Sequence, residues 1–141
     1  MFTTAAAQTL LASAFAPWVQ ALDLSVQSVD ATGGVTVSMP VTGNVARMGG
    51  IVCGQALAAL ADTTMVLSTA AHFGGLRDVA TTNLDTQFLS AGRGDTIRCT
   101  ARIIRAGRSL IFAQADLIAL PDGRPVASAS ATFFVPQKAP E

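Results

Sequence analysis

The sequence predicts a single α+β domain over residues 1–141, in which an antiparallel sheet of about six strands curls around one long apolar helix. Three observations predict this fold class. An apolar segment without helix breakers runs from Gln55 to about Ala71 and is followed by Gly74-Gly75. Two strand-like segments precede it, and four more follow it, separated by glycine-containing turns. A sheet of that length can cover such a helix on most of its sides.

The segments before the long helix predict a short helix and a hairpin. Residues 4–16 are expected to be helical up to Pro17, with an apolar face formed by Leu10, Leu11 and Phe15. Apolar and polar residues alternate over 22–29 and again over 35–39, which predicts two antiparallel strands joined by a glycine turn. Residues 40–50 are expected to form a loop.

The long helix is apolar on every face and carries one carboxylate, Asp62, near its middle. The residues one turn before and after Asp62 cannot pair with a charge, and burial of an unpaired carboxylate is unfavourable. We therefore expect Asp62 to open onto a cleft or a subunit boundary, and it is the leading functional candidate. The alternative is a structural acid that bonds to backbone amides, Thr63 or Thr64.

Segment 51–71 is also long enough to cross a bilayer. A central Asp is unfavourable in a membrane, and no Lys/Arg cluster flanks either end of the segment. A buried core helix is the favoured interpretation.

Four strand-like segments follow the helix. Because the turns between them are short, each strand is expected to pair antiparallel with the next, as a meander. The expected strands occupy residues 79–89, 95–105, 109–120 and 125–135, and residues 136–141 are expected to form a loose tail.

Composition limits the function classes. Half of the residues are apolar and 13% are charged, a thin polar coat that predicts a homo-oligomer. The formal net charge is zero and no basic run occurs, which argues against nucleic acid as a partner. With Cys53, Cys99 and a single histidine, neither a disulfide scaffold nor a zinc site is expected. The first basic residue is Arg47, so no targeting peptide is expected and the cytoplasm is the predicted location.

The glycine turn, the helix with Asp62, and segments 81–89, 104–108 and 123–130 occur in an order and spacing that resembles the hot-dog-fold thioesterases of the PaaI (phenylacetate pathway) type. The resemblance covers roughly residues 40–135. It implies a hot-dog fold and hydrolysis of an acyl-CoA thioester. It also implies an active site shared between subunits of a dimer or a dimer of dimers, a homotetramer. Coenzyme A would enter as part of the substrate, and no other cofactor is expected.

The resemblance also assigns site residues. In that family the helix usually begins with His-Gly-Gly, and the catalytic acid lies nine residues after the His. These positions hold Cys53, Gly54, Gln55 and Asp62 in this chain. A family Asn six residues before the His corresponds to Arg47, with Asn44 close by. Thr81 aligns with a small hydroxyl residue near the acid.

The chemistry of two of these residues follows from their positions on the helix. Free amides and the helix dipole at Gly54 favour negative charge on a thioester oxygen. Asp62 can activate water as a general base or attack the carbonyl itself to form an anhydride, and the sequence does not separate these routes. Eight helical residues separate Gly54 from Asp62, a rise of about 12 Å. Both can act on one carbonyl only if they come from different subunits.

Other polar residues have two interpretations each. Thr81 would hold the attacking water or is an ordinary strand residue. Arg105 and Arg108 flank a glycine turn and either bind the phosphates of coenzyme A, as the resemblance implies, or form a solvated hairpin tip. Cys53 is expected to be a small packing residue, because no histidine is near it in sequence.

Three functions compete. The first is an acyl-CoA thioesterase acting on a small- to medium-chain or aryl thioester. The second is a hot-dog protein that binds a thioester without cleaving it, motivated by Arg47, Cys53 and Gln55. A hot-dog hydratase is poorly supported, since His72, the only histidine, lies ten residues after Asp62.

Overall fold

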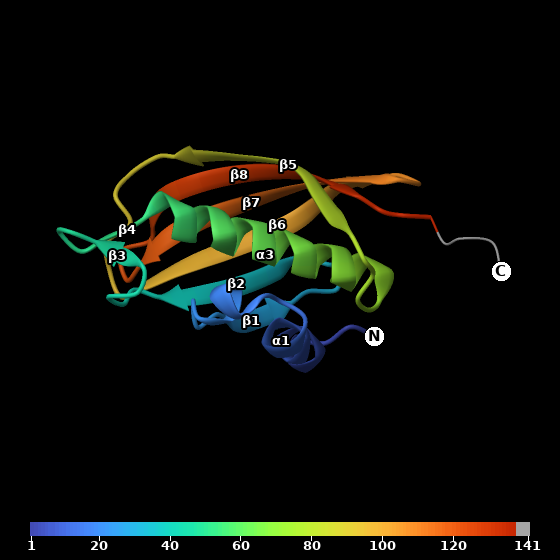
Figure 1. Ribbon diagram of the computed structural model, residues 1–141, viewed down its shortest axis with the longest axis horizontal. Helices are drawn as coiled ribbons and strands as arrows, with labels where there is room; N and C mark the ends of the chain where they lie inside the picture. Colours follow the sequence, from blue (N-terminus) through green and yellow to red (C-terminus); the bar gives the residue numbers. More distant parts are fainter. Residues whose placement is uncertain (138–141) are drawn as a thin grey trace.

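The computed structural model of the chain describes residues 1–137, and in it one 20-residue helix, α3 (Gly54–Phe73), lies along the concave face of a six-stranded antiparallel sheet (Figure 1). The other elements are α1 (Thr4–Ser13), α2 (Pro17–Gln20), β1 (Ser25–Val29), β2 (Val35–Pro40), β3 (Ala46–Arg47), β4 (Ile51–Val52), β5 (Ala80–Phe88), β6 (Thr96–Ala106), β7 (Leu110–Leu120) and β8 (Arg124–Phe134). The α+β architecture predicted from the sequence is confirmed.

Helix α3 begins and ends where the sequence predicts. Cys53 precedes it in an extended conformation, and Gly74 ends it in the left-handed conformation at φ 75°, which a glycine adopts without strain. The Gly75 amide donates to the Ala70 carbonyl at 2.9 Å. The sheet and α1 do not cover α3 completely. The half-buried face of α3 consists of Ala58, Ala59, Asp62 and Val66.

The strand order is β1-β2-β6-β7-β8-β5, so the predicted meander is wrong for β5. That strand pairs with β8 and not with β6, which follows it in sequence. Its connection to β6 bonds instead to other elements: the Gly92 carbonyl accepts from the Val52 amide, and the Asp95 amide donates to the Leu120 carbonyl, each at 2.9 Å. This connection crosses the end of the sheet near the start of α3 (Figure 1).

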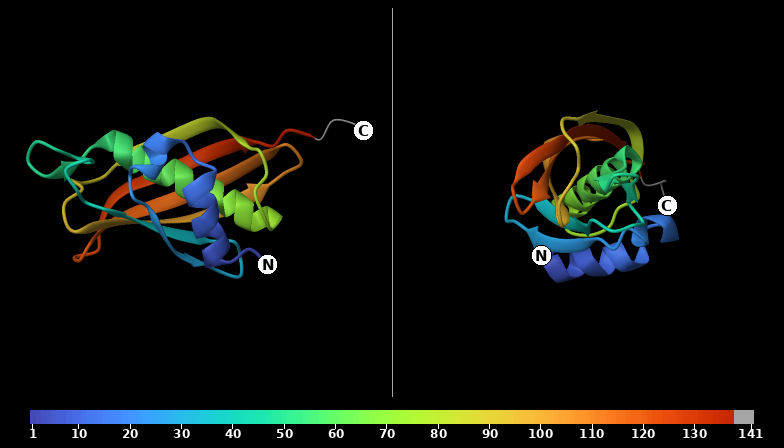
Figure 2. Two further views of the ribbon diagram at one scale, coloured as in Figure 1. Left: turned by 60° about the horizontal axis from the view of Figure 1, so that its bottom comes forward. Right: turned by 90° about the vertical axis from the view of Figure 1, so that its left-hand side faces the viewer.

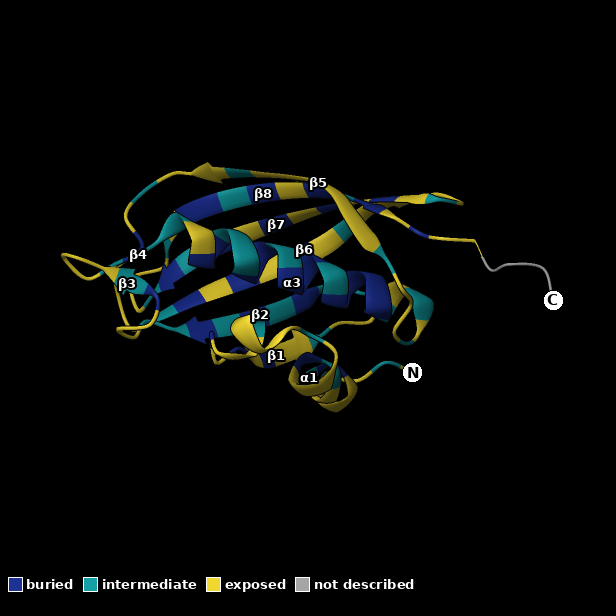
Figure 3. Cartoon of the chain, in the orientation of Figure 1, coloured by how far each residue is buried: buried dark blue, intermediate teal, exposed yellow. Residues whose placement is uncertain are grey.

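The two edges of the sheet differ. At the β1 edge, side chains of α1 satisfy backbone donors, since Gln8 Oε1 accepts from the Val26 amide at 2.8 Å and Thr4 Oγ1 accepts from the Val29 amide at 3.2 Å. Figure 2 shows α1 packed beside this edge. At the other edge, β5 is exposed at every residue except Thr86 (Figure 3). An uncovered edge strand is a template for pairing with another chain.

Smaller differences concern element ends. The helix expected over residues 4–16 stops at Ser13, and Pro17 begins the short helix α2, because proline suits the first position of a helix. The expected loop 40–50 contains β3, which pairs with β4. Of the expected tail, residues 138–141 lie outside the described residues. No helix in the described part of the chain is long and apolar enough to span a membrane.

Candidate active site

Asp62 lies on the half-buried face of α3, next to strand β5. Its Oδ1 accepts a hydrogen bond from the Thr81 hydroxyl at 3.0 Å. Desolvation raises the pKa of Asp62 above its ordinary value of 3.8, and the Thr81 hydrogen bond opposes this shift. The neighbouring Thr64 does not hold the acid, because its hydroxyl donates to the Leu60 carbonyl at 2.7 Å. The carboxylate is therefore tied to the edge strand and not to its own helix.

A β-bulge aims Thr81 at the acid. The pairing of β5 with β8 shifts register between Thr81 and Asn83, and Thr81 lies opposite the fully buried Phe133 on the helix side of the sheet. The intervening Thr82 donates its hydroxyl to the Thr132 carbonyl at 3.1 Å. Bulges commonly re-aim side chains beside functional sites.

A side chain at the start of α3 would be crowded by an aromatic ring. A Cβ at Gly54 would lie 3.1 Å from the ring of Phe88, which stands over this turn from the end of β5. Cys53 makes no side-chain hydrogen bond to the helix, and the first turn contains no acidic residue. The first amides of a helix have no partner within it, so this turn favours an anion or a polarised carbonyl.

A cavity of about 400 Å³ opens at this turn, a size typical of small-molecule sites. We call it the Gly54 cavity. It is lined by Arg47, Ile51, Val52, Gly54, Leu57, Phe88, Ser90, Ala91 and Gly92. Its walls are mostly apolar, with a single charged side chain.

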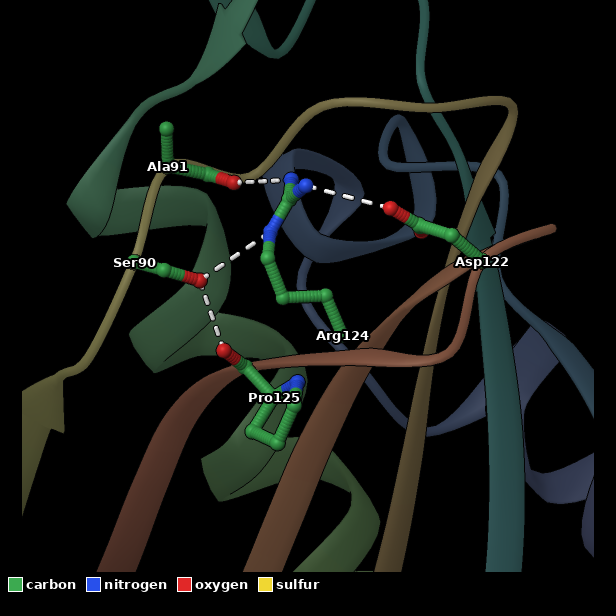
Figure 4. Close-up of polar contacts among 5 residues, drawn as sticks. All are labelled: Ser90, Ala91, Asp122, Arg124 and Pro125. Carbon is green, nitrogen blue, oxygen red and sulfur yellow. Dashed lines mark hydrogen bonds and ion pairs between the residues drawn. The ribbon is translucent and has the colours of Figure 1, made fainter.

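Arg124 holds the loop that forms one wall of the Gly54 cavity (Figure 4). Its Nη2 donates to the Ala91 carbonyl at 2.8 Å, and its Nε donates to Ser90 Oγ at 3.3 Å. The Ser90 hydroxyl donates in turn to the Pro125 carbonyl at 2.6 Å. An ion pair with Asp122 at 3.1 Å orients the guanidinium. The loop is thereby fixed to the start of β8.

The predicted site residues form two groups within one chain. Arg47 and Gly54 meet at the Gly54 cavity, whereas Asp62 and Thr81 form a pair about 12 Å further along α3. The remaining candidates join neither group. Cys53 is half-buried before α3, while Asn44, Gln55, Arg105 and Arg108 are exposed.

Arg105 and Arg108 lie at the β6–β7 end of the sheet, away from the start of α3 (Figure 1).

Sequence reasoning missed three residues of the site: Phe88, Ser90 and Arg124. Phe88 matters because the strand end places it over Gly54, a contact between positions 34 residues apart that no local pattern reveals. Ser90 and Arg124 act through each other, and they too are distant in sequence. The described residues contain no group of three or more His, Cys, Asp or Glu side chains arranged to hold a metal.

Comparisons with known proteins agree with this fold. The model of the thioesterase superfamily matches residues 49–126, which is 78 of the 141 residues. Zebra fish thioesterase superfamily member 2 superposes with a TM-score of 0.84 at 23% identity, over 96% of this chain and 100% of that one. A thioesterase of Haemophilus influenzae gives 0.84 at 19%, over 97% and 92% of the two chains.

The PaaI protein from the phenylacetic acid degradation operon of E. coli gives a TM-score of 0.80 at 18% identity, over 96% of this chain and 97% of that one. No protein of curated function matches the chain by sequence.

Proposed function

Since the chain belongs to the thioesterase superfamily and has the PaaI-type hot-dog fold, we propose that it hydrolyses a small- to medium-chain or aryl-CoA thioester to the free acid and coenzyme A. The observation that carries the proposal is the Asp62–Thr81 pair. A half-buried carboxylate with a raised pKa and one hydroxyl partner is poised for proton transfer.

Two mechanisms fit this pair. As general base, Asp62 accepts a proton from a water molecule held by Thr81, and the water oxygen bonds to the thioester carbon. As nucleophile, a carboxylate oxygen attacks that carbon and forms an anhydride, which water then hydrolyses. In both routes the C–S bond breaks and the departing thiolate takes up a proton.

The carbonyl oxygen needs a donor that Asp62's own chain does not supply, because its Gly54 amide is about 12 Å away along α3. We assign this role to Gly54 of the partner subunit, where free amides stabilise the developing oxyanion. The exposed edge of β5 supports such a dimer, since Leu84 and Phe88 are 36% and 55% exposed on that strand.

A second contact through exposed Leu110, Phe112 and Phe134 on the outer sheet face would give the dimer of dimers.

Cationic and polar side chains are the candidates for binding the coenzyme A part of the substrate. Arg47 at the Gly54 cavity suits the polar part of the thiol, and Arg105 and Arg108 suit phosphates of the nucleotide if another subunit brings them near. Asn44 and Gln55 do not line the cavity and remain polar candidates for substrate binding, with Cys53 as a packing residue. The cytoplasm stays the predicted location.

Thiol release from a panel of acyl- and aryl-CoA esters tests the proposed reaction, with wild type compared with Asp62→Asn. We predict turnover of at least one ester by wild type. The variant should lose at least about tenfold in kcat, which corresponds to ~1.4 kcal/mol of barrier, because asparagine neither accepts the proton nor attacks. Turnover that the variant retains in full would refute the role of Asp62.

A thioester-binding protein without activity is the second candidate. It is favoured by Cys53 and Gln55, which replace the His and the second Gly of the family pattern. Thermal stabilisation by the same esters with no thiol release from wild type would establish this function instead.

A further inference from the structure

A second cavity lies beyond the acid, at the opposite end of the half-buried face of α3. We call it the Phe15 cavity. Its volume is about 390 Å³, and its lining is Ala14, Phe15, Val66, Leu76, Arg77, Asp78 and Val79. Val66 follows Asp62 by one helical turn, about 6 Å, and Val79 precedes Thr81 by two residues. The cavity therefore opens beside the Asp62–Thr81 pair.

We propose that the Phe15 cavity receives the acyl chain of the thioester, and that Phe15 and Leu76 set the length of chain that it accepts. This inference rests on the proposed function in one respect: the thioester carbonyl must lie at Asp62. A chain that continues from that carbonyl along α3 enters this cavity directly.

The lining favours a hydrocarbon chain over the polar parts of coenzyme A. Five of the seven lining residues are apolar, and an acyl chain gains free energy when it leaves water for such surroundings. The cationic group of the lining is already engaged, because the Arg77 guanidinium lies 4.5 Å from the centre of the Phe73 ring. The lining offers no second cation to help bind a phosphate.

Twofold symmetry adds a path for the thiol part of the substrate. If Gly54 of the partner subunit meets Asp62, the two α3 helices run antiparallel with position 58 at the axis. That arrangement places Gly54 of the partner subunit about one helical turn from Val66, which follows Asp62 by four residues. The partner's Gly54 cavity then adjoins the Phe15 cavity, and the thioester carbonyl lies where the two meet.

One wall of the Phe15 cavity comes from the amino-terminal segment. The thioesterase model covers residues 49–126, so Ala14 and Phe15 lie outside it. The amino-terminal segment therefore adds a wall that the matched region does not contain. Leu76 also lines the cavity and is 55% exposed, so its replacement leaves the core intact.

Binding of thioether analogues tests the inference independently of hydrolysis. S-butyl-CoA and S-octyl-CoA carry no thioester bond to cleave. Calorimetry measures the Kd of each analogue for wild type, for Leu76→Trp and for the control Gln27→Trp, which places the same indole at an exposed position of β1. Leu76→Trp should weaken S-octyl-CoA binding at least about tenfold and S-butyl-CoA binding less than about twofold. Gln27→Trp should change neither Kd.

An unchanged octyl-to-butyl ratio in Leu76→Trp would overturn the inference. S-octyl-pantetheine, which lacks the nucleotide, provides a second check. If Leu76→Trp changes the ratio of the Kd values of S-octyl-CoA and S-octyl-pantetheine but not the octyl-to-butyl ratio, the cavity holds the thiol part and the inference is overturned.

Phe15→Ala provides the opposite change and should tighten binding of a longer analogue, S-dodecyl-CoA, relative to S-butyl-CoA. If wild type cleaves no ester but Leu76→Trp still selects against S-octyl-CoA, the proposed hydrolysis fails while the acyl site stands. If wild type cleaves esters but both variants keep its chain-length profile, hydrolysis stands and the acyl site fails.

Discussion

Asp62 combines two properties that oppose each other: it is partly desolvated, and its proposed role requires the ionised form. Desolvation raises its pKa above 3.8, and the hydrogen bond from Thr81 compensates in part. The folded protein therefore binds this proton more tightly than the unfolded chain does. The two states are equally protonated well below pH 3.8, and the free energy of unfolding falls as the pH rises from 3.8 through the raised pKa.

Because the ionised Asp62 carboxylate is unfavourably desolvated in the folded protein, Asp62→Asn should stabilise the protein at neutral pH. The amide carries no charge to desolvate, and its oxygen can still accept the Thr81 hydrogen bond. Each ~1 kcal/mol added to the free energy of unfolding would raise Tm by roughly 4 °C for a chain of this size. Thermal melts at pH 7 should show the increase, and the difference from wild type should shrink as the pH approaches 3.8. Asp85→Asn, at an exposed position of β5, is the control and should leave Tm nearly unchanged. A lower Tm for Asp62→Asn than for wild type at pH 7 would contradict the unfavourable desolvation of Asp62.

Individual site residues could be predicted where neighbouring residues in the sequence marked them. A lone acid among apolar residues marked Asp62, and glycine marked both the start and the end of α3. The partner of Asp62 was predicted only through alignment with a family position. A register shift in β5 aims Thr81 at the acid, and nothing in the local pattern of that strand indicates a bulge.

Among the elements, the connection from β5 to β6 is the one that shapes the site. It lines the Gly54 cavity, accepts a hydrogen bond from β4 through Gly92, and is fixed to β8 by Arg124 (Figure 4). This position explains why the predicted meander failed. The chain between β5 and β6 crosses the end of the sheet beside the Gly54 cavity, so the two strands are not neighbours.

Weakening this anchor should impair substrate binding more than folding. Arg124→Lys keeps the charge but cannot donate to Ser90, Ala91 and Asp122 together. We expect KM to rise about tenfold with little change in kcat, and Tm to fall by only a few degrees. Arg102→Lys is the matched control, because Arg102 bonds Gln114 at 2.9 Å on the exposed face of the sheet, away from the site. Unchanged KM in Arg124→Lys would show that the loop needs no anchor.

The strands themselves were well predicted, whereas their order was not. Each strand after α3 lies within one residue of its predicted ends, because glycine-containing turns separate the strands in the sequence. Pairing of β5 with β8 depends on contacts between distant segments. The two cavities arise in the same way, from residues that meet only after folding.

For the whole molecule, the two sheet edges explain how subunits would meet. Side chains of α1 occupy the β1 edge, and β5 leaves the other edge open with apolar side chains exposed. A dimer through β5 would cover these side chains and the half-buried face of α3 together. The low charged fraction of the chain is consistent with surface of this kind.

Mixed dimers test whether each active site is shared between two subunits. Asp62→Asn and Gly54→Val should each be inactive alone, the second because any side chain there meets the Phe88 ring. If Asp62 acts with Gly54 of the partner subunit, each mixed dimer contains one intact site. Subunit exchange between the two variants should then restore about a quarter of wild-type thiol release, since half of the dimers are mixed and each has one of two sites. If the mixture stays inactive although native mass spectrometry detects mixed dimers, Asp62 does not act with Gly54 of the partner subunit, and the shared site is refuted.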